Sequence, residues 1–417
     1  MKMIVQKFGG TSLKGEKDRE RALSHVGEAV KDGYKVVVVV SAMGRTGDPY
    51  ATDTLLGLVN EDEMKINNRE WDMLASCGEV ISSVVFANML NNSGLKATAL
   101  TGAQAGFRTN DVHRNAKIID MKCERLKETL EHYDVAVVAG FQGRRKNGDV
   151  TTIGRGGSDT SAAALGAALN AEWIDIFTDV DGVMTADPRI VSQAQSLSVV
   201  TYNEICNLAY QGAKVIHPRA VEIAMESKVP IRIRSTHSDS LGTLVTSINA
   251  DRPGRDIQER LITGIAHSPG VSQIRVLEKE GLSDLQSKVF KAMAENNVSV
   301  DLININPNGV VYTVTEEMTN RAVTALQEIG YEPEVIPGCA KVSAVGAGMN
   351  GIPGVASKIV SALASQGIQI LQSADSHTTI WVLVKQDDVA KAVNALHETF
   401  ELNKIHEKSG APAEKNV

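Results

Sequence analysis

Three short stretches of the chain combine glycines with charged side chains in a way that suits the binding of a phosphorylated ligand. The first stretch, KFGGTS, runs from Lys7 to Ser12, between a short apolar run and a helix-like pattern. Paired glycines let backbone N–H groups approach a phosphate, and the start of a helix adds a favourable dipole. Lys7 would add a positive charge. A strand–turn–helix corner with a surface lysine has the same pattern, so this stretch alone leaves both interpretations open.

The second stretch, TTIGRGGSDTSAAALGAALNA (151–171), is more specific. Three glycines flank Arg155, and Ser158 and Asp159 precede an alanine-rich helix. A Ser or Asp at this place is a common helix N-cap, but a cap requires neither the glycines nor the arginine. The guanidinium of arginine is a planar fork that matches a carboxylate. The stretch therefore indicates a site for an anionic ligand.

The third stretch, FTDVDGVMTADPR (177–189), follows a β-branched run, where open α/β sheets bind ligands. Its Asp179 and Asp181 are not part of an EF-hand, because the third acidic position and the closing Glu are missing. A later stretch, QGAKVIHPRAVE (211–222), places Lys214 near a helix. The chain lacks a Gly-Lys dipeptide, H-R-D, D-F-G and H-E-x-x-H, which argues against a Walker A loop, a protein kinase and a zincin.

Elements that position these residues follow from the apolar patterns of residues 1–235. Short β-branched runs predict strands at 3–8, 35–42, 96–102, 134–141, 173–179 and 229–235, and helical periodicity predicts helices at 16–32, 70–91, 159–171 and 203–227. Val36–Val40 has no polar alternation, which is typical of a strand buried on both faces. This alternation predicts a mainly parallel sheet with helices on both sides. KNGD at 146–149 predicts a hairpin turn, the polar residues 236–260 a linker, and 403–417 a flexible tail.

An internal repeat occupies the rest of the chain. Residues 281–326 align without a gap to 351–396, and each copy shows the order strand, helix, strand, strand, helix. We therefore expect two ferredoxin-like α+β modules, at 261–338 and 339–402. The second copy contains Gly346-Ala-Gly348-Met-Asn-Gly351, which fits the dinucleotide fingerprint G-x-G-x-x-G. The first copy lacks the first two glycines, and too little chain follows for a doubly wound domain, so we do not expect NAD binding.

Composition narrows the possible partners. The formal net charge is −7, and no long basic run occurs, which argues against nucleic acid and anionic membranes. The four cysteines are widely spaced and form no C-x-x-C motif, so no disulfide framework, zinc site or other metal site is expected. We find neither a signal peptide nor a continuous membrane-spanning apolar run. A cytoplasmic protein is the expectation.

Together these stretches resemble the amino-acid kinase superfamily and, over nearly the whole chain, the aspartokinases. The matching motifs occur in the family's order: KFGGTS, VVVVSAMG, SCGE, VAGFQG, TTIGRGGSDTSAAAL, TDVDGVMTADPR and GAKVIHPRAVE. The resemblance is strongest to the Bacillus-type isozymes controlled by diaminopimelate. It implies a three-layer kinase domain at 1–235 followed by two ACT modules. It also implies ATP-dependent phosphorylation of L-aspartate to 4-phospho-L-aspartate, the first step towards lysine (diaminopimelate), threonine and methionine.

The resemblance further implies site residues, with ATP and Mg²⁺ as cofactors. The catalytic residues would be Lys7, Asp159 and Lys214. ATP would contact Lys7, Phe8, Gly9, Gly10, Ser158, Thr178, Asp179, Asp181, Gly182, Val183, Arg189, Lys214 and Val215. Aspartate would contact Ser41, Thr46, Glu79, Arg155, Gly156, Gly157 and Ser158. Glu79 would pair with the α-ammonium, although a glutamate within a helix is usually only solvated.

ACT modules imply an amino-acid effector and a homodimer or higher homo-oligomer. We expect diaminopimelate as effector, with lysine or threonine as alternatives, and Asp301 as the partner of its ammonium. The candidate contacts are Ser283, Asp284, Asp301, Asn304, Asn306, Ser373 and Asp375. Two other functions stay open: a kinase for another small acid, such as glutamate, and a non-catalytic amino-acid sensor. The ACT pair argues against the first, and retention of Lys7 and Arg155 argues against the second.

Overall fold

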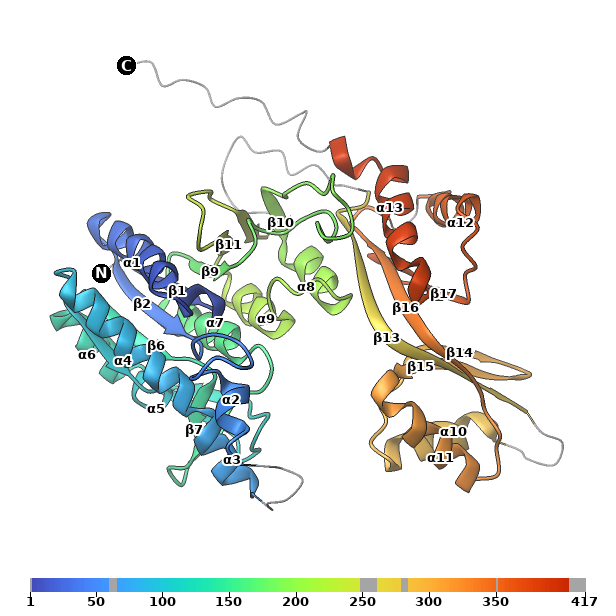
Figure 1. Ribbon diagram of the computed structural model, residues 1–417, viewed down its shortest axis with the longest axis horizontal. Coiled ribbons are helices and arrows are strands. Elements are labelled where there is room, and N and C mark those ends of the chain that lie inside the picture. Colours follow the sequence, from blue (N-terminus) through green and yellow to red (C-terminus); the bar gives the residue numbers. More distant parts are fainter. Residues whose placement is uncertain (1, 60–65, 248–260, 279–283, 350–351, 405–417) are drawn as a thin grey trace. The chain divides into compact units, whose positions relative to one another are not determined.

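The computed structural model describes residues 2–59, 66–247, 261–278, 284–349 and 352–404 (Figure 1). The described residues form two compact units. The first unit contains those of Met1–Val183, Ser196–Ala209 and Lys214–Ile257. The second unit contains those of Met184–Gln195, Tyr210–Ala213 and Gln258–Val417. The second unit therefore includes two short segments that lie within the range we expected for the kinase domain.

An eight-stranded sheet forms the centre of the first unit, in the order β10-β12-β11-β9-β1-β2-β6-β3. All neighbouring strands are parallel except the pair β11–β12. Its strands are β1 (Met3–Phe8), β2 (Lys35–Val40), β3 (Ala97–Leu100), β6 (Val135–Ala139), β9 (Ile174–Thr178), β10 (Val199–Thr201), β11 (Ile231–Ser235) and β12 (Thr243–Thr246). All six strands predicted from the β-branched runs are confirmed.

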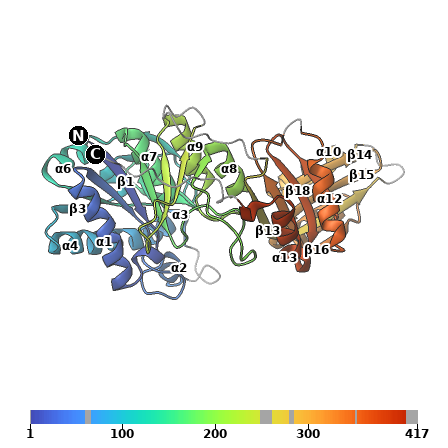
Figure 2. The same ribbon diagram turned by 90° about the horizontal axis from the view of Figure 1, so that it is seen from above.

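Helices cover both faces of this sheet, and Figure 2 shows α1 and α4 on one side of β1, with α7 and α9 on the other. Phe86 and Leu90 of α4 pack with Ile4 and Val38 in one buried cluster. On the other face, a Cβ at Gly166 of α7 would lie 2.5 Å from the side chain of Ile174, so a small residue is required there. The helices are α1 (Glu16–Lys31), α2 (Thr52–Leu56), α3 (Asn68–Ala75), α4 (Cys77–Asn92), α5 (Gly102–Ala105), α6 (Glu124–His132), α7 (Gly157–Leu169), α8 (Tyr202–Tyr210) and α9 (Pro218–Ser227).

A smaller four-stranded sheet, in the order β5-β4-β7-β8, was not predicted. It consists of β4 (Phe107–Thr109), β5 (Ile118–Met121), β7 (Gln142–Arg144) and β8 (Val150–Thr152). The predicted hairpin at 146–149 is confirmed, because β7 and β8 pair antiparallel across it. Strands of three or four residues are too short to show a periodic pattern.

Three segments differ from the expected elements. The helix predicted at 70–91 is two helices that meet at Ser76, and the helix predicted at 203–227 is broken between Tyr210 and Pro218. The expected linker contains β12, whose Thr243 and Val245 are fully buried. Its alternation is only four residues long and lies in a polar stretch, so it did not stand out. Residues 248–260 of that linker lie outside the described residues.

The second unit repeats one arrangement twice, as predicted. The first copy is β13 (Gly264–Leu277), α10 (Leu285–Glu295), β14 (Asp301–Asn306), β15 (Gly309–Thr315) and α11 (Thr319–Glu328). The second copy is β16 (Glu334–Val345), α12 (Val355–Ser365), β17 (Gln372–Asp375), β18 (Thr379–Lys385) and α13 (Val389–Thr399). The two copies share one six-stranded sheet, β14-β15-β13-β16-β18-β17, in which β13 and β16 pair antiparallel. The boundary that we placed at 338/339 falls within β16.

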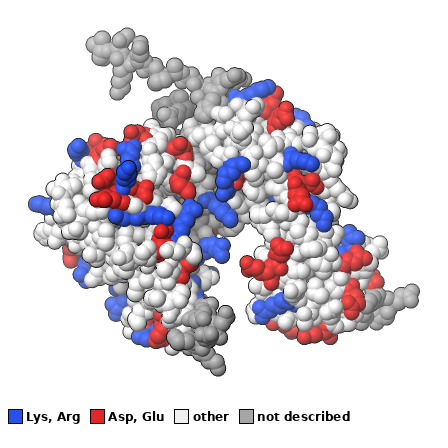
Figure 3. All heavy atoms as spheres, in the orientation of Figure 1, with Lys and Arg blue, Asp and Glu red and all other residues white. Residues whose placement is uncertain are grey.

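Two surface properties bear on the predicted partners. Over the described residues, the helical stretch Asn68–Asn92 is long and apolar enough to cross a membrane, but half of its most apolar window is buried. Since α4 contributes Phe86 and Leu90 to the core, this stretch behaves as a core helix. On the face shown in Figure 3, basic and acidic side chains both occur on each unit.

Candidate active site

Four parallel strands of the first unit end at one edge of the large sheet. Phe8 of β1 pairs with Val40 of β2 and Phe177 of β9, and Val40 pairs with Ala139 of β6. The loops that follow β1, β2 and β6, together with Glu79 and the residues around the start of α7, line a cavity of about 540 Å³, a usual size for a small-ligand site. The lining residues are Lys7, Gly10, Ser41, Ala42, Gly44, Arg45, Thr46, Ala51, Thr52, Asp53, Glu79, Phe141, Gly154, Arg155, Gly156, Gly157, Ser158 and Asp159.

Ten residues that the sequence assigned to catalysis, ATP or aspartate line this cavity together. They are Lys7, Gly10, Ser41, Thr46, Glu79, Arg155, Gly156, Gly157, Ser158 and Asp159. The structure therefore brings together side chains from β1, α4 and α7 that are far apart in the sequence. Their role as ligand contacts stays a prediction, which the juxtaposition supports.

Lys7 and Asp159 form an ion pair in this cavity, with 2.7 Å between Nζ and Oδ1. Oδ2 of Asp159 accepts a hydrogen bond of 3.3 Å from the backbone N–H of His217, at the N-terminus of α9. Burial holds the pKa of the adjacent His217 below its usual range. Asp159 thus connects the lysine of β1 to α7 and α9.

Two glycines of the motifs are required by close packing. A Cβ at Gly10 would lie 2.6 Å from the carbonyl oxygens of both Ala42 and Gly44, so the two loops touch through their backbones. Gly156 has a φ of +68°, and a Cβ there would lie 2.2 Å from the ring of His217. Glycine tolerates both the left-handed backbone and the close contact.

Glu79 is the most buried titratable group of the cavity. Only 3% of the residue is exposed, and Oε1 accepts a hydrogen bond of 3.1 Å from the N–H of Ala42. Oε2 has no hydrogen-bond partner among the described residues. Burial raises the pKa of Glu79 to about 8, although the Ala42 N–H opposes the shift. A buried carboxylate with a free oxygen in a cavity is suited to receive a cation from a ligand.

The loop after β2 contributes charged residues that the sequence analysis missed. Nη2 of Arg45 lies 3.0 Å from Oδ2 of Asp179, and Thr46 donates a hydrogen bond of 2.6 Å to Oδ2 of Asp53. Thr46 lines the cavity as predicted, but its hydroxyl is already engaged. A polar loop directly after a buried strand, MGRTGDPYATD, was the signal that could have identified Arg45 and Asp53.

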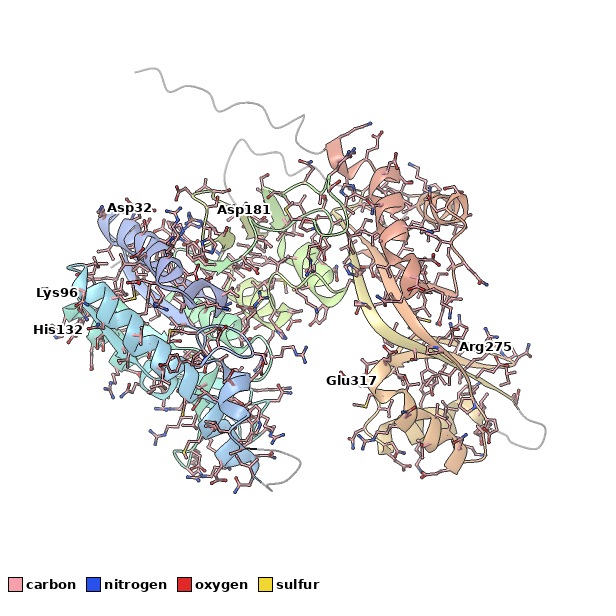
Figure 4. All side chains as sticks on the ribbon, in the orientation of Figure 1. Asp32, Lys96, His132, Asp181, Arg275 and Glu317 are labelled. Atoms are coloured by element: carbon pink, nitrogen blue, oxygen red, sulfur yellow. The ribbon has the colours of Figure 1, made fainter. Side chains whose placement is uncertain are left out.

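Most residues predicted to bind ATP do not line the cavity. Phe8 is fully buried, and its ring stacks on that of Phe177 at 4.6 Å, so only its backbone is available to a ligand. Asp181 is exposed on the loop after β9 and is labelled in Figure 4. The others outside the lining are Gly9, Thr178, Asp179, Gly182, Val183, Arg189, Lys214 and Val215. Of these, Arg189 belongs to the second unit and donates to Asp187.

Lys214 is exposed and lies between α8 and α9. Within the described part of the chain, Asp159 is paired with Lys7 and not with Lys214, so the structure joins Asp159 to one of the two predicted lysines. Among the described residues, no three His, Cys, Asp or Glu side chains gather to hold a metal ion.

Five of the seven predicted effector residues lie on the two edge strands of the sheet of the second unit. Asn304 and Asn306 belong to β14, and Ser373 and Asp375 belong to β17. The two edges meet where Gln372 donates a hydrogen bond to the carbonyl of Leu302. Residues from both copies therefore lie near one another, as an effector site shared between the copies would require.

Asp301, our candidate for the effector ammonium, already has a cationic partner. Its Oδ2 lies 2.6 Å from Nζ of Lys341 on β16. Burial acts to raise the pKa of Asp301, but the Lys341 ammonium outweighs it and the pKa lies below its usual range. Asp284 is exposed at the start of α10, and Ser283 lies outside the described residues.

Comparison with known proteins gives the same picture for both units. Residues 2–235 match the model of the amino acid kinase family, and residues 334–398 match that of an ACT domain. Aspartokinase 1 of Bacillus subtilis is 66% identical over 404 residues, which cover 97% of this chain and 100% of that protein.

Solved structures extend the similarity to the fold. E. coli aspartokinase III in complex with aspartate and ADP aligns with a TM-score of 0.78 at 24% identity, covering 95% of this chain and 99% of that one. The same enzyme in complex with lysine and aspartate aligns with a TM-score of 0.73 at 25% identity, covering 95% and 99%. The chain therefore belongs to the aspartokinases, within the amino acid kinase family.

Proposed function

We propose that Glu79, Arg155 and Lys7 carry the aspartokinase reaction of this chain, which transfers the γ-phosphoryl group of ATP to L-aspartate. Glu79 binds the α-ammonium of aspartate, Arg155 grips one of its carboxylates, and Lys7 stabilises the charge on the transferring phosphoryl group. These three groups line one cavity, and their charges complement those of the two substrates.

The reaction needs no general base. The side-chain carboxyl of aspartate has a pKa near 4 and is ionised at neutral pH. One of its oxygens attacks the γ-phosphorus, the bond from that phosphorus to the ADP oxygen breaks, and ADP leaves with the bonding electrons. The product, 4-phospho-L-aspartate, enters lysine, threonine and methionine synthesis. Catalysis then depends on positioning and charge stabilisation, as in other phosphoryl transfers.

The other cavity residues support these roles. Asp159 holds Lys7 at 2.7 Å, and the N–H groups of Gly9 and Gly10 donate to phosphate oxygens. Ser41 and Thr46 complete the aspartate pocket, and Lys214 adds a second positive charge to the phosphoryl group. The ATP residues named above, from Thr178 to Val183, contact ribose and adenine. Mg²⁺ would arrive with ATP, neutralise phosphate charge and be held mainly by phosphate oxygens.

The observation that carries the proposal is the state of Glu79. Its carboxyl group is buried, and Oε2 lacks a partner among the described residues. An unpartnered polar atom of this kind costs free energy. A substrate ammonium would supply both the hydrogen bond and the opposite charge. Through this contact, Glu79 would distinguish an amino acid from a simple dicarboxylate, which has no ammonium group.

The experiment compares L-aspartate with succinate, which lacks the ammonium group, by trapping the acyl phosphate with hydroxylamine. The wild type should favour aspartate strongly, and Glu79→Gln should reduce that preference by roughly tenfold or more, the range of a lost charged hydrogen bond. Glu204→Gln is the control, because Glu204 is also buried but does not line the cavity. If Glu79→Gln keeps the wild-type preference, the assignment of Glu79 is wrong.

We also propose that the ACT modules of the second unit regulate the enzyme by binding an amino acid. We infer that diaminopimelate is the effector, with lysine and threonine as alternatives, and that it binds near the edge strands β14 and β17. Two copies of the chain or more associate through the second unit, whose edge strand β14 exposes Ile303 and Ile305. The protein acts in the cytoplasm, where ATP and the pathway amino acids are present.

A further inference from the structure

We propose that Asp72 is a positioning residue that fixes the distance between Glu79 and Arg155, the two groups assigned to aspartate. The inference rests on the proposed function of those two residues. Asp72 is not part of the cavity lining, so it acts on aspartate only through its neighbours.

The carboxylate of Asp72 lies at the centre of a buried hydrogen-bond network. Its side chain is completely inaccessible to solvent. Thr152 donates a hydrogen bond of 2.6 Å to Oδ1, and Nδ1 of His113 lies 2.6 Å from Oδ2. The backbone N–H of Arg114 lies 3.0 Å from Oδ1 and 3.2 Å from Oδ2. A buried carboxylate with donors on both oxygens joins three separate segments of the chain: α3, the loop 113–115 and the end of β8.

The geometry around His113 fixes the direction of these hydrogen bonds. Nε2 of His113 lies 3.3 Å from Nη1 of Arg145. A guanidinium can only donate, so Nε2 accepts and Nδ1 carries the proton that is donated to Asp72. Arg145 is itself held by Asp111, at 2.8 Å. Each group facing Asp72 is thus a donor.

One arm of the network leads to Arg155. Arg114 has a φ of +64°, a left-handed conformation that costs free energy in a non-glycine residue and persists only where the surroundings hold it. The two contacts from its N–H to Asp72 supply that restraint. The next residue, Asn115, lies against the loop of Arg155, because a Cβ on Gly154 would be 2.6 Å from Oδ1 of Asn115. Thr152, three residues before Arg155 in the chain, anchors the same loop directly.

The other arm leads to Glu79. Asp72 belongs to α3, and Glu79 lies two helical turns further on, in the first turn of α4. The junction between the helices is held by Gln142, which donates a hydrogen bond of 3.0 Å to the carbonyl of Ser76. Gly78 touches the loop after β2, since a Cβ there would lie 2.7 Å from the side chain of Ala42. A shift of α3 relative to β8 therefore changes the spacing of Glu79 and Arg155.

The test is steady-state kinetics on the full chain with both substrates varied. Asp72→Asn replaces one accepting oxygen by an NH₂ group that faces donors. We expect KM for aspartate to rise about tenfold to a hundredfold, since a misplacement near 1 Å can cost that much. KM for ATP should change less than about twofold.

Variants of His113 provide a second test if Asp72→Asn fails to fold. His113→Leu removes the donor and should raise KM for aspartate in the same way. His113→Asn offers an amide N–H near the place of Nδ1 and should restore a KM close to that of the wild type. A role in stability alone would not give this rescue together with a selective change in one KM.

Asp175→Asn is the matched control. Asp175 is also fully buried and is paired with Arg232 at 2.6 Å, but it does not line the cavity. It should lower thermal stability and leave KM for aspartate unchanged. The inference is overturned if Asp72→Asn and His113→Leu raise KM for aspartate and KM for ATP equally. It is also overturned if they change neither constant. If Glu79→Gln and Arg155→Lys also leave KM for aspartate unchanged, the proposed aspartate site itself is wrong.

Discussion

Nζ of Lys7, on the first strand, lies 2.7 Å from Oδ1 of Asp159, in the first turn of α7. Each side chain is only 13% exposed. An ion pair that is this well shielded holds the ammonium in one position, in contrast to a surface pair with mobile partners. Lys7 is therefore held in place before any ligand binds, in the same cavity as Arg155, which suits the electrostatic catalysis proposed above.

Lys7→Ala should lower kcat by roughly a hundredfold or more, because in the proposed function it removes the charge that stabilises the transferring phosphoryl group. It should also lower the melting temperature, because Asp159 loses its partner in a shielded site. The double variant Lys7→Ala/Asp159→Ala should recover stability but not turnover. Initial rates and thermal melts of the three proteins test this, and near-normal turnover in Lys7→Ala would contradict the assignment.

Arg155→Lys should raise KM for aspartate much more than KM for ATP. The lysine keeps the charge but loses the planar fork that can bind a carboxylate with two hydrogen bonds. Crossed titrations of both substrates measure the two constants. Equal increases in both would indicate that Arg155 contacts phosphate instead.

The sequence predicted the elements whose pattern is long or strongly apolar. Val36–Val40 could be placed in the centre of a sheet because five consecutive valines without a polar residue are typical of a strand buried on both faces. All five are buried in the structure. The second sheet was missed because β4, β7 and β8 each contain only three residues. Ser76 breaks a helix without a proline or glycine at the break itself, so periodicity alone predicted one continuous helix.

Residues of the candidate site could likewise be predicted where they belong to a local motif, and were missed where only the fold brings them together. Lys7, Arg155 and Asp159 stand beside glycines in motifs, so their chemistry could be inferred from the sequence. Asp72 stands in an ordinary helical pattern, and its partners come from residues 113–152. Only the fold brings these segments together, and no local spacing indicates the contact.

Asp301→Asn should weaken inhibition by the effector. Asp301 is paired with Lys341 at 2.6 Å, so an effector ammonium that binds there must compete with an internal cation. Inhibition curves with diaminopimelate, lysine and threonine, compared between wild type and variant, should show an inhibition constant raised about tenfold or more for one of them, the range of a lost charged hydrogen bond. Unchanged curves for all three amino acids would remove Asp301 from the effector site.

Glu79 should make stability depend on pH. Its pKa is raised by burial from 4.5 to about 8 in the folded protein. Between these values the folded state retains a proton that the unfolded state has lost, so the free energy of unfolding falls as pH rises. The stability that this proton contributes is fully present below about pH 4.5 and is lost as the pH rises through about 8. Glu79→Gln should therefore gain stability relative to the wild type from pH 5 to pH 8, and the difference should be constant above that; urea unfolding measures it.

The same group should make KM for aspartate depend on pH. The α-ammonium binds the ionised carboxylate, but below about pH 8 most of the free enzyme has Glu79 protonated. Binding must then release a proton, so KM should fall up to about tenfold for each pH unit gained below 8 and be level from 8 to 9. His217 does not interfere from pH 7 upward, because burial holds its pKa below the usual range of a histidine. Initial rates at saturating ATP test this in wild type and Glu79→Gln. The variant should give a flat profile, and a flat wild-type profile would show that no proton leaves Glu79 when aspartate binds.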